Sequence, residues 1–131
     1  MANKISFDLV SPEKLLLSAQ ADMVTVPGTE GYMGVMAGHA PVVTTLRAGM
    51  IDVNADGRDD RYFIRGGFAE IGPAKITVLA EEAVPMTELD LAVLDQRIQD
   101  AQEDEIAAQT DGERLRAAQL VDDLKLVRAA F

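Results

Sequence analysis

Residues 50–65 read MIDVNADGRDDRYFIR, and this stretch points to a β fold. Alternating apolar residues approach the pair Asp56-Gly57 from Ile51, and a second apolar group follows the pair and ends at Ile64. An Asp-Gly pair readily adopts the two positive φ angles of a tight hairpin turn. The stretch therefore predicts two antiparallel strands that are joined at Asp56-Gly57.

Segments on both sides of this hairpin also have the pattern of strands. Apolar and polar residues alternate in residues 5–9 and 23–26, and β-branched residues are enriched in residues 76–79. Turn signals occur at Ser11-Pro12, Pro27-Gly28, Gly38 to Pro41, Gly49, Asp56-Gly57, Gly66-Gly67 and Gly72-Pro73. Turn signals that recur every 8 to 12 residues or so are typical of an all-β sandwich or barrel.

The residue composition of the chain changes at Pro85. All five prolines and nine of the ten glycines lie at or before this residue, in a chain of 131 residues. The remaining residues are rich in Ala, Leu, Glu, Asp, Gln and Arg, and most of these residue types favour helix. We therefore expect a β domain over residues 1–85 and an α-helical domain over residues 86–131.

Two helices are expected after Pro85. Thr87 is a candidate N-cap for the first helix, and Thr110-Asp111-Gly112 interrupts the apolar spacing. The two apolar stripes are Leu91, Leu94, Ile98, Ala101 and Ile106, then Ala117, Leu120, Val121, Leu124 and Val127. Because only about three polar residues connect the helices, the second must turn back on the first as an antiparallel hairpin.

The composition excludes several classes of function. Twelve basic and 22 acidic residues give a formal net charge of −10, which repels a nucleic-acid backbone and an anionic membrane surface. The chain has no cysteine, which excludes disulfides, thiolate zinc sites and a cysteine nucleophile. No apolar run is long enough to span a bilayer, and the first residues lack the pattern of a secretory signal. We expect a protein that binds no nucleic acid and does not itself enter a membrane.

Three segments could carry chemistry, and none has the complete pattern. Residues 52–57 match the first six positions of a calcium-binding EF-hand loop, but the twelfth position is Phe63 instead of glutamate. The glycines of residues 28–34 match neither the Rossmann fingerprint nor the P-loop. His39 is the only histidine, so it has no second histidine with which to share a metal. We expect a binding protein rather than an enzyme, without a metal or a cofactor.

Six segments together resemble one protein family. They are residues 9–14 (LVSPEK), 26–35 (VPGTEGYMGV), 38–41 (GHAP), 45–49 (TLRAG), 66–70 (GGFAE) and 78–81 (VLAE). In order and spacing they resemble the epsilon subunit of F-type ATP synthases. The resemblance covers almost the whole chain, and the β half carries the most specific motifs.

The resemblance implies a flattened β-sandwich of ten strands followed by an antiparallel two-helix hairpin. It implies a non-catalytic subunit in the central rotor stalk of a proton-transporting ATP synthase, which couples rotation of the c-ring to the catalytic head through the gamma subunit. The subunit would lie peripherally on the cytoplasmic face of the bacterial inner membrane and would reach the membrane only through the complex.

The resemblance also implies two contact surfaces. The c-ring-facing loop would consist of Gly28, Thr29, Glu30, Gly31, Tyr32, Met33 and Gly34, and the gamma interface would include Gly38, His39, Ala40 and Pro41. Tyr32 stands where relatives often carry an acidic or other polar residue.

The helical hairpin is a regulatory part in some bacterial relatives. Some bind ATP there through an Ile/Leu-Asp-x-x-Arg-Ala motif, and others insert the hairpin into the alpha/beta head and inhibit hydrolysis. Here Leu89-Asp90-Leu91-Ala92 is followed by Val93, so the arginine of the motif is missing and ATP binding is not expected. The hairpin remains a candidate regulator of hydrolysis. The alternative is a free-standing nucleotide- or calcium-binding regulatory domain.

Overall fold

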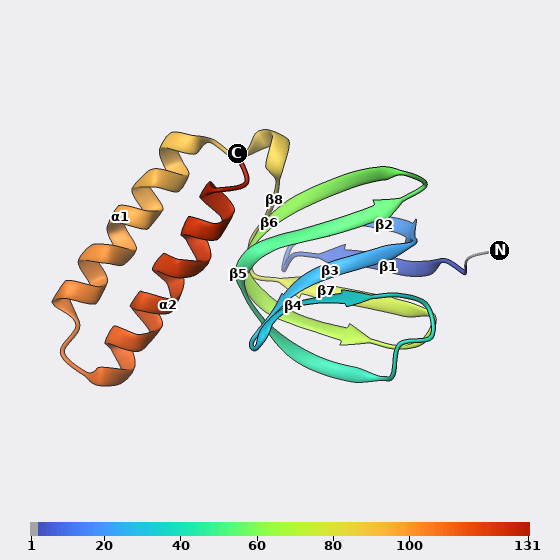
Figure 1. Ribbon diagram of the computed structural model, residues 1–131, viewed down its shortest axis with the longest axis horizontal. Helices are drawn as coiled ribbons and strands as arrows, with labels where there is room; N and C mark the ends of the chain where they lie inside the picture. Colours follow the sequence, from blue (N-terminus) through green and yellow to red (C-terminus); the bar gives the residue numbers. More distant parts are fainter. Residues whose placement is uncertain (1–2) are drawn as a thin grey trace. The chain divides into compact units, whose positions relative to one another are not determined.

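A computed structural model describes residues 3–131; residues 1 and 2, which fall in the predicted β domain, lie outside this range. The chain divides into two units, Met1–Met86 and Thr87–Phe131. Figure 1 traces both, with the strands in the first unit and the two α-helices in the second.

The described part of the first unit contains eight strands. They are β1 (Ile5–Val10), β2 (Leu15–Ala21), β3 (Met23–Gly28), β4 (Gly31–Val35), β5 (Val42–Ala55), β6 (Arg58–Ile71), β7 (Lys75–Ala80) and β8 (Ala83–Pro85). The strand order is β2-β1-β7-β6-β5-β3-β4, and β8 pairs with β6. The β1–β7 pair is parallel, whereas the other recorded pairs are antiparallel.

Two long strands carry the sheet around the bend of the sandwich. β5 and β6 are each 14 residues long and curve strongly, as Figure 1 shows. β6 pairs with β8 through residues 62–64 and with β7 through residues 67–71, so its neighbour changes at Gly66-Gly67. Gly67 has a φ of +142°, and a Cβ at this position would lie 2.0 Å from the carbonyl oxygen of Leu79. Only glycine fits at this point of the bend.

The strand count corrects the expectation of ten. The turns expected at Gly49 and at Gly66-Gly67 are also wrong, because these glycines lie inside β5 and β6. Both strands continue unbroken through the bend. If each were divided there into two shorter strands, the number of strands would be ten. The coarser expectation of a β-sandwich followed by two helices is confirmed.

The core of the first unit is apolar and fully enclosed. In β1, burial alternates along the strand, and Ile5, Phe7 and Leu9 have no exposed surface. Residues from the other strands that pack in the same core include Val24, Val26, Ile51, Val53, Ile64, Ile71, Ile76 and Val78. This is the two-residue period from which residues 5–9 were predicted to form a strand.

The turn between β5 and β6 has the predicted geometry, with φ angles of +53° at Asp56 and +79° at Gly57. Lys4 Nζ lies 2.6 Å from a carboxylate oxygen of Asp22 and 2.6 Å from one of Asp56. The Asp56 amide also donates to Asp22 Oδ2 at 2.9 Å. This cluster joins the start of β1, the β2–β3 junction and the β5–β6 turn.

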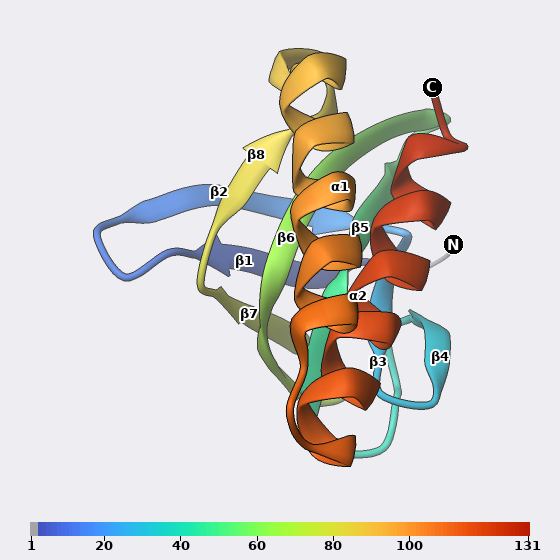
Figure 2. The ribbon, with the colours of Figure 1, turned by 90° about the vertical axis from the view of Figure 1, so that its left-hand side faces the viewer.

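The second unit is a hairpin of two helices, α1 (Leu91–Ala107) and α2 (Asp111–Arg128), which Figure 2 shows side by side. Three residues, Ala108–Thr110, connect them. Arg128 Nε at the end of α2 donates to Asp95 Oδ1 near the start of α1 at 2.8 Å, so the helices are antiparallel. The expected hairpin is confirmed.

Two details of the helical expectation are wrong. The first helix does not begin at Thr87, because Met86–Glu88 form a short 3-10 helix and Asp90 is the N-cap of α1. Ile106, which was placed on the apolar stripe of α1, is 86% exposed. The buried residues of the stripes are Leu94, Ala101, Val121, Leu124 and Val127.

Candidate functional site

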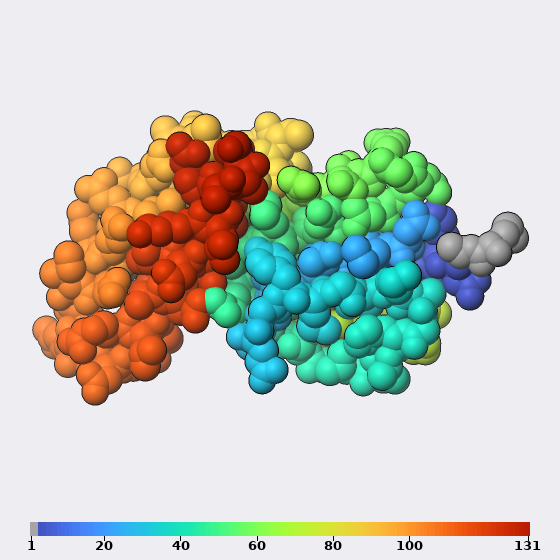
Figure 3. Space-filling model, in the orientation of Figure 1, coloured from blue at the N-terminus to red at the C-terminus, as the bar shows by residue number. Residues whose placement is uncertain are grey.

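The β3–β4 hairpin holds all seven residues of the expected c-ring-facing loop, with Gly28 at the end of β3 and residues 31–34 in β4. Gly28 and Gly31 pair across the end of the two strands, so Thr29 and Glu30 form the tip. Both tip residues are exposed, as are Gly31, Tyr32 and Gly34. In Figure 3 the light-blue turn projects from the surface of the sandwich. It therefore offers a small polar tip that a partner can reach.

Two side-chain contacts attach this turn to β5. Arg47 donates through a guanidinium nitrogen to the Thr29 carbonyl at 3.2 Å. The Met50 amide donates to the Tyr32 hydroxyl at 3.1 Å. Sequence reasoning missed both contacts, because each joins residues 18 positions apart and no periodicity connects them.

The expected gamma interface, residues 38–41, lies in the loop between β4 and β5. The Gly38 amide donates to the Pro73 carbonyl at 2.7 Å, which ties this loop to the β6–β7 turn. The half-buried His39 donates through Nδ1 to the carbonyl of Ala40 at 2.7 Å, so this ring nitrogen is engaged by the backbone. This arrangement gives His39 a part in shaping the loop.

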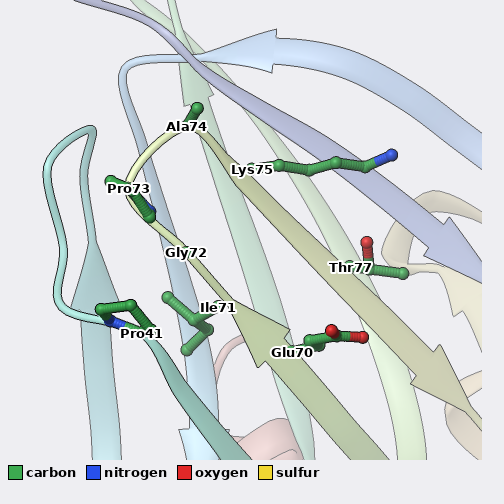
Figure 4. Close-up of a pocket in the computed structure, with 8 residues that line it drawn as sticks. All are labelled: Pro41, Glu70, Ile71, Gly72, Pro73, Ala74, Lys75 and Thr77. Atoms are coloured by element: carbon green, nitrogen blue, oxygen red, sulfur yellow. The ribbon is translucent and has the colours of Figure 1, made fainter.

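A shallow groove of about 570 Å³ begins at this loop. Figure 4 shows that its apolar residues Pro41, Ile71 and Pro73 gather at one end, while Glu70, Lys75 and Thr77 project toward the other. Lys75 also forms an ion pair of 3.0 Å with Asp8. The Ser18 hydroxyl and this ammonium group hold the pKa of Asp8 below its usual value.

The two expected contact surfaces are separate. Thr29 and Glu30, at the tip of the turn, precede the five-residue strand β4, and the loop of residues 38–41 follows it. A strand of this length spans roughly 16 Å at about 3.3 Å per residue. The tip of the turn and the loop of residues 38–41 therefore do not form one site.

The calcium-like motif lies in a β-hairpin. Asp52 and Asn54 belong to β5, and Asp56 is in the turn, where Lys4 binds its carboxylate. Hydrogen bonds to Asp22 and Asp56 raise the pKa of the Lys4 ammonium group. The positive charge beside the Asp56 carboxylate is therefore that of Lys4. Residues 3–131 contain no group of three or more acidic, histidine or cysteine side chains arranged to hold a metal.

Asp90, the aspartate of the incomplete ATP-binding motif, is the N-cap of the first helix of the hairpin. The Asp90 carboxylate accepts a hydrogen bond from the Ala92 amide at 2.8 Å and thereby caps α1. At the start of α2, Thr110 accepts from the Glu113 amide at 3.1 Å in the same role. None of the described helices is long and apolar enough to cross a membrane.

Comparison with known proteins first defines the class. The family model for "ATP synthase, Delta/Epsilon chain, beta-sandwich domain" matches residues 4–86. A relative from Parvibaculum lavamentivorans, named ATP synthase epsilon chain, is 54% identical and covers 98% of both chains. A second of that name from Mesorhizobium japonicum is 47% identical over 100% of this chain and 98% of its own.

Solved structures agree with this class. A chain in the cryo-EM structure of the Euglena gracilis mitochondrial ATP synthase, a complex of OSCP, F1 and c-ring, has a TM-score of 0.79. It is 27% identical, and the match covers 97% of this chain and 81% of that one. The chain belongs to the family of ATP synthase epsilon chains. It is a non-catalytic subunit of this membrane-associated complex.

Proposed function

We propose that this chain works in the central rotor stalk of a proton-transporting F-type ATP synthase and couples rotation of the c-ring to the catalytic head through the gamma subunit. The observation that carries this proposal is the full-length similarity to epsilon chains, which spans the sandwich and the hairpin alike. The similar Euglena chain comes from a complex that includes F1 and the c-ring.

The two separate surfaces suit a subunit with two partners. We assign the Gly28 to Gly34 turn to the c-ring, because it is exposed and polar at its tip. We assign residues 38–41 to gamma, since this loop adjoins a groove with an apolar end. One short strand, β4, would then connect the two contacts directly.

We assign the helical hairpin to contact with the alpha/beta head and to regulation of ATP hydrolysis. Several large apolar side chains of the hairpin remain exposed: Val93 (46%), Ile106 (86%), Leu115 (70%) and Leu126 (57%). Exposed apolar side chains on a polar helix pair suit burial against another protein. The hairpin would make this contact without bound nucleotide.

We place the chain at the cytoplasmic face of the bacterial inner membrane, where it reaches the membrane only through the complex. The two epsilon chains named above, from Parvibaculum lavamentivorans and Mesorhizobium japonicum, are bacterial. A net charge of −10 opposes direct binding to an anionic lipid surface.

Co-purification tests the proposal. The tagged chain is recovered from detergent-solubilised membranes of its host, and we expect gamma, the c-ring and the catalytic subunits to accompany it. A tagged chain that elutes alone, while the untagged synthase stays intact, would contradict the assignment to the rotor.

Charge reversal at the turn tests the c-ring assignment. We expect Glu30→Lys to lower proton pumping per ATP hydrolysed in inverted membrane vesicles, because the exposed Glu30 lies at the tip of the turn. Glu13→Lys is the matched control, since Glu13 is also exposed but lies in the β1–β2 turn. Equal coupling in both variants would show that the β3–β4 turn is not the c-ring contact.

A further inference from the structure

The ladder between β3 and β5 is irregular beside the β3–β4 turn. Its register shifts between Thr25 and Gly28. In this interval Pro27 has no amide hydrogen to donate, and the amide of Met50 in β5 donates to the Tyr32 hydroxyl instead of to a β3 carbonyl. The hydroxyl of Tyr32 thus reaches across β3 and takes the place of a ladder hydrogen bond.

Gly49 provides the space for this contact. A Cβ at Gly49 would lie 2.7 Å from the Tyr32 hydroxyl oxygen and 2.9 Å from Pro27 Cβ. These separations are too short for carbon, and Gly49 is buried, so a larger residue would displace the Tyr32 side chain. Because Gly49 does not have a positive φ, the absence of a side chain is its role here.

Arg47 holds the tip of the same turn. Its guanidinium donates to the carbonyl of Thr29, and the neighbouring Leu46 pairs with Gly28 in the ladder. Residues 46–50 of β5 therefore contact the turn at its tip, at its base and through Tyr32. A two-residue tip attached only by its strand ends could swing, whereas these contacts fix it to a strand that also pairs with β6.

We propose that Tyr32, Arg47 and Gly49 are positioning residues that fix the β3–β4 turn to β5, so that force received at the turn passes into the whole sandwich instead of bending the turn. This inference rests on the proposed contact between the turn and the c-ring. It assigns Tyr32 an inward role through its hydroxyl, although its side chain is also 45% exposed.

Hydrogen exchange in the full-length isolated subunit gives the first test. In Tyr32→Phe the Met50 amide loses its acceptor, and we expect it to exchange roughly threefold to tenfold faster, as the loss of one hydrogen bond implies. Tyr62→Phe is the matched control, because it removes the other tyrosine hydroxyl of the chain from β6. Unchanged exchange at Met50 in Tyr32→Phe would overturn the inference, whatever the partner of the turn.

The assembled synthase gives the second test. We expect Tyr32→Phe and Arg47→Ala to lower proton pumping per ATP hydrolysed, by about twofold or more, and Arg47→Lys to restore part of it by returning a donor. Tyr62→Phe should leave both pumping and hydrolysis unchanged. If Glu30→Lys uncouples the complex but Tyr32→Phe and Arg47→Ala do not, the inference is wrong and the c-ring contact stands. If none of these variants changes coupling, both are wrong.

Discussion

The partly buried position of Asp52 in β5 disfavours the charged form of its carboxylate. Asp52 lies opposite Arg61 in the β5–β6 ladder, and its Oδ2 is 3.5 Å from the Arg61 Nε. Its Oδ1 is buried and has no hydrogen-bond partner. Burial, followed by the nearby charge of Asp59, raises the pKa of Asp52 above its usual 3.8, although Arg61 opposes the shift.

The variant Asp52→Asn tests this account through pH. Because the folded pKa of Asp52 is raised, the folded state binds its proton more tightly, and stability falls as the pH rises from about 3.8 through the raised pKa. We expect Asp52→Asn to remove this fall and to be up to about 1 kcal/mol more stable at neutral pH. Urea unfolding at a series of pH values between 4 and 7 measures it.

Asp8 and Asp22 provide the contrast for that experiment. Hydrogen bonds hold the pKa of each below 3.8, so their stabilisation is present above 3.8 and is lost as the pH falls through the lowered values. Asp8 and Asp22 therefore change the stability at lower pH than Asp52 does. If the stability of Asp52→Asn fell above pH 3.8 as steeply as that of the wild type, Asp52 would not be the cause of the fall.

At single residues, the sequence predicts local geometry better than distant contacts. The Asp56-Gly57 turn was predicted correctly, since its two positive φ angles follow from the residue types alone. The sequence predicts turns at Gly49 and Gly67, but each is a glycine because a group from a distant segment lies against it: the Tyr32 hydroxyl and the Leu79 carbonyl. A single sequence carries no local signal for such neighbours.

At the scale of elements, the start of α1 shows what decides a helix boundary. Thr87 and Asp90 both have cap-forming side chains, and the structure uses Asp90. The 3-10 helix at Met86–Glu88 places Thr87 inside a different element, so its hydroxyl is not positioned at the first turn of α1. Residue type alone could not choose between them.

Replacing the two candidate caps tests this boundary. We expect Asp90→Ala to cost about 1 kcal/mol in the stability of the hairpin, because the Ala92 amide loses its acceptor. Thr87→Ala is the control and should have little effect. Amide exchange over the first turn of α1 reports the difference, and equal effects from the two variants would argue against Asp90 as the cap.

Local sequence patterns also predict the strands and the surface segments, but not the contacts between distant residues. Alternation and turn residues predict β1, β3 and β7 to within two residues at each end. The family motifs point to two surface segments, and the structure places the tip of the first and the loop of the second at opposite ends of β4. The Lys4–Asp22–Asp56 cluster and the Arg47–Thr29 bond lie outside any sequence pattern, because folding alone brings those residues together.

For the whole molecule, the sandwich holds a complete core of its own. Every residue of its main buried cluster lies between Ile5 and Ala80, and none comes from the hairpin. We therefore expect a chain cut after Met86 to fold cooperatively and to bind gamma. Circular dichroism with thermal melting measures the folding, and a pull-down with purified gamma measures the binding. An unfolded truncated chain would show that the hairpin completes the sandwich, and a folded one that leaves gamma unbound would show that gamma binding requires the hairpin.

The parallel pairing of β1 with β7 has a consequence for synthesis on the ribosome. Ser6 pairs with Lys75, a partner made about 70 residues later. At bacterial and eukaryotic elongation rates of about 5 to 20 residues per second, β1 waits on the order of 3 to 14 seconds for this neighbour. During that time β2 can cover only one of its edges. The nascent chain therefore carries an open strand edge until β7 emerges, and this interval is when it is most exposed to wrong pairing.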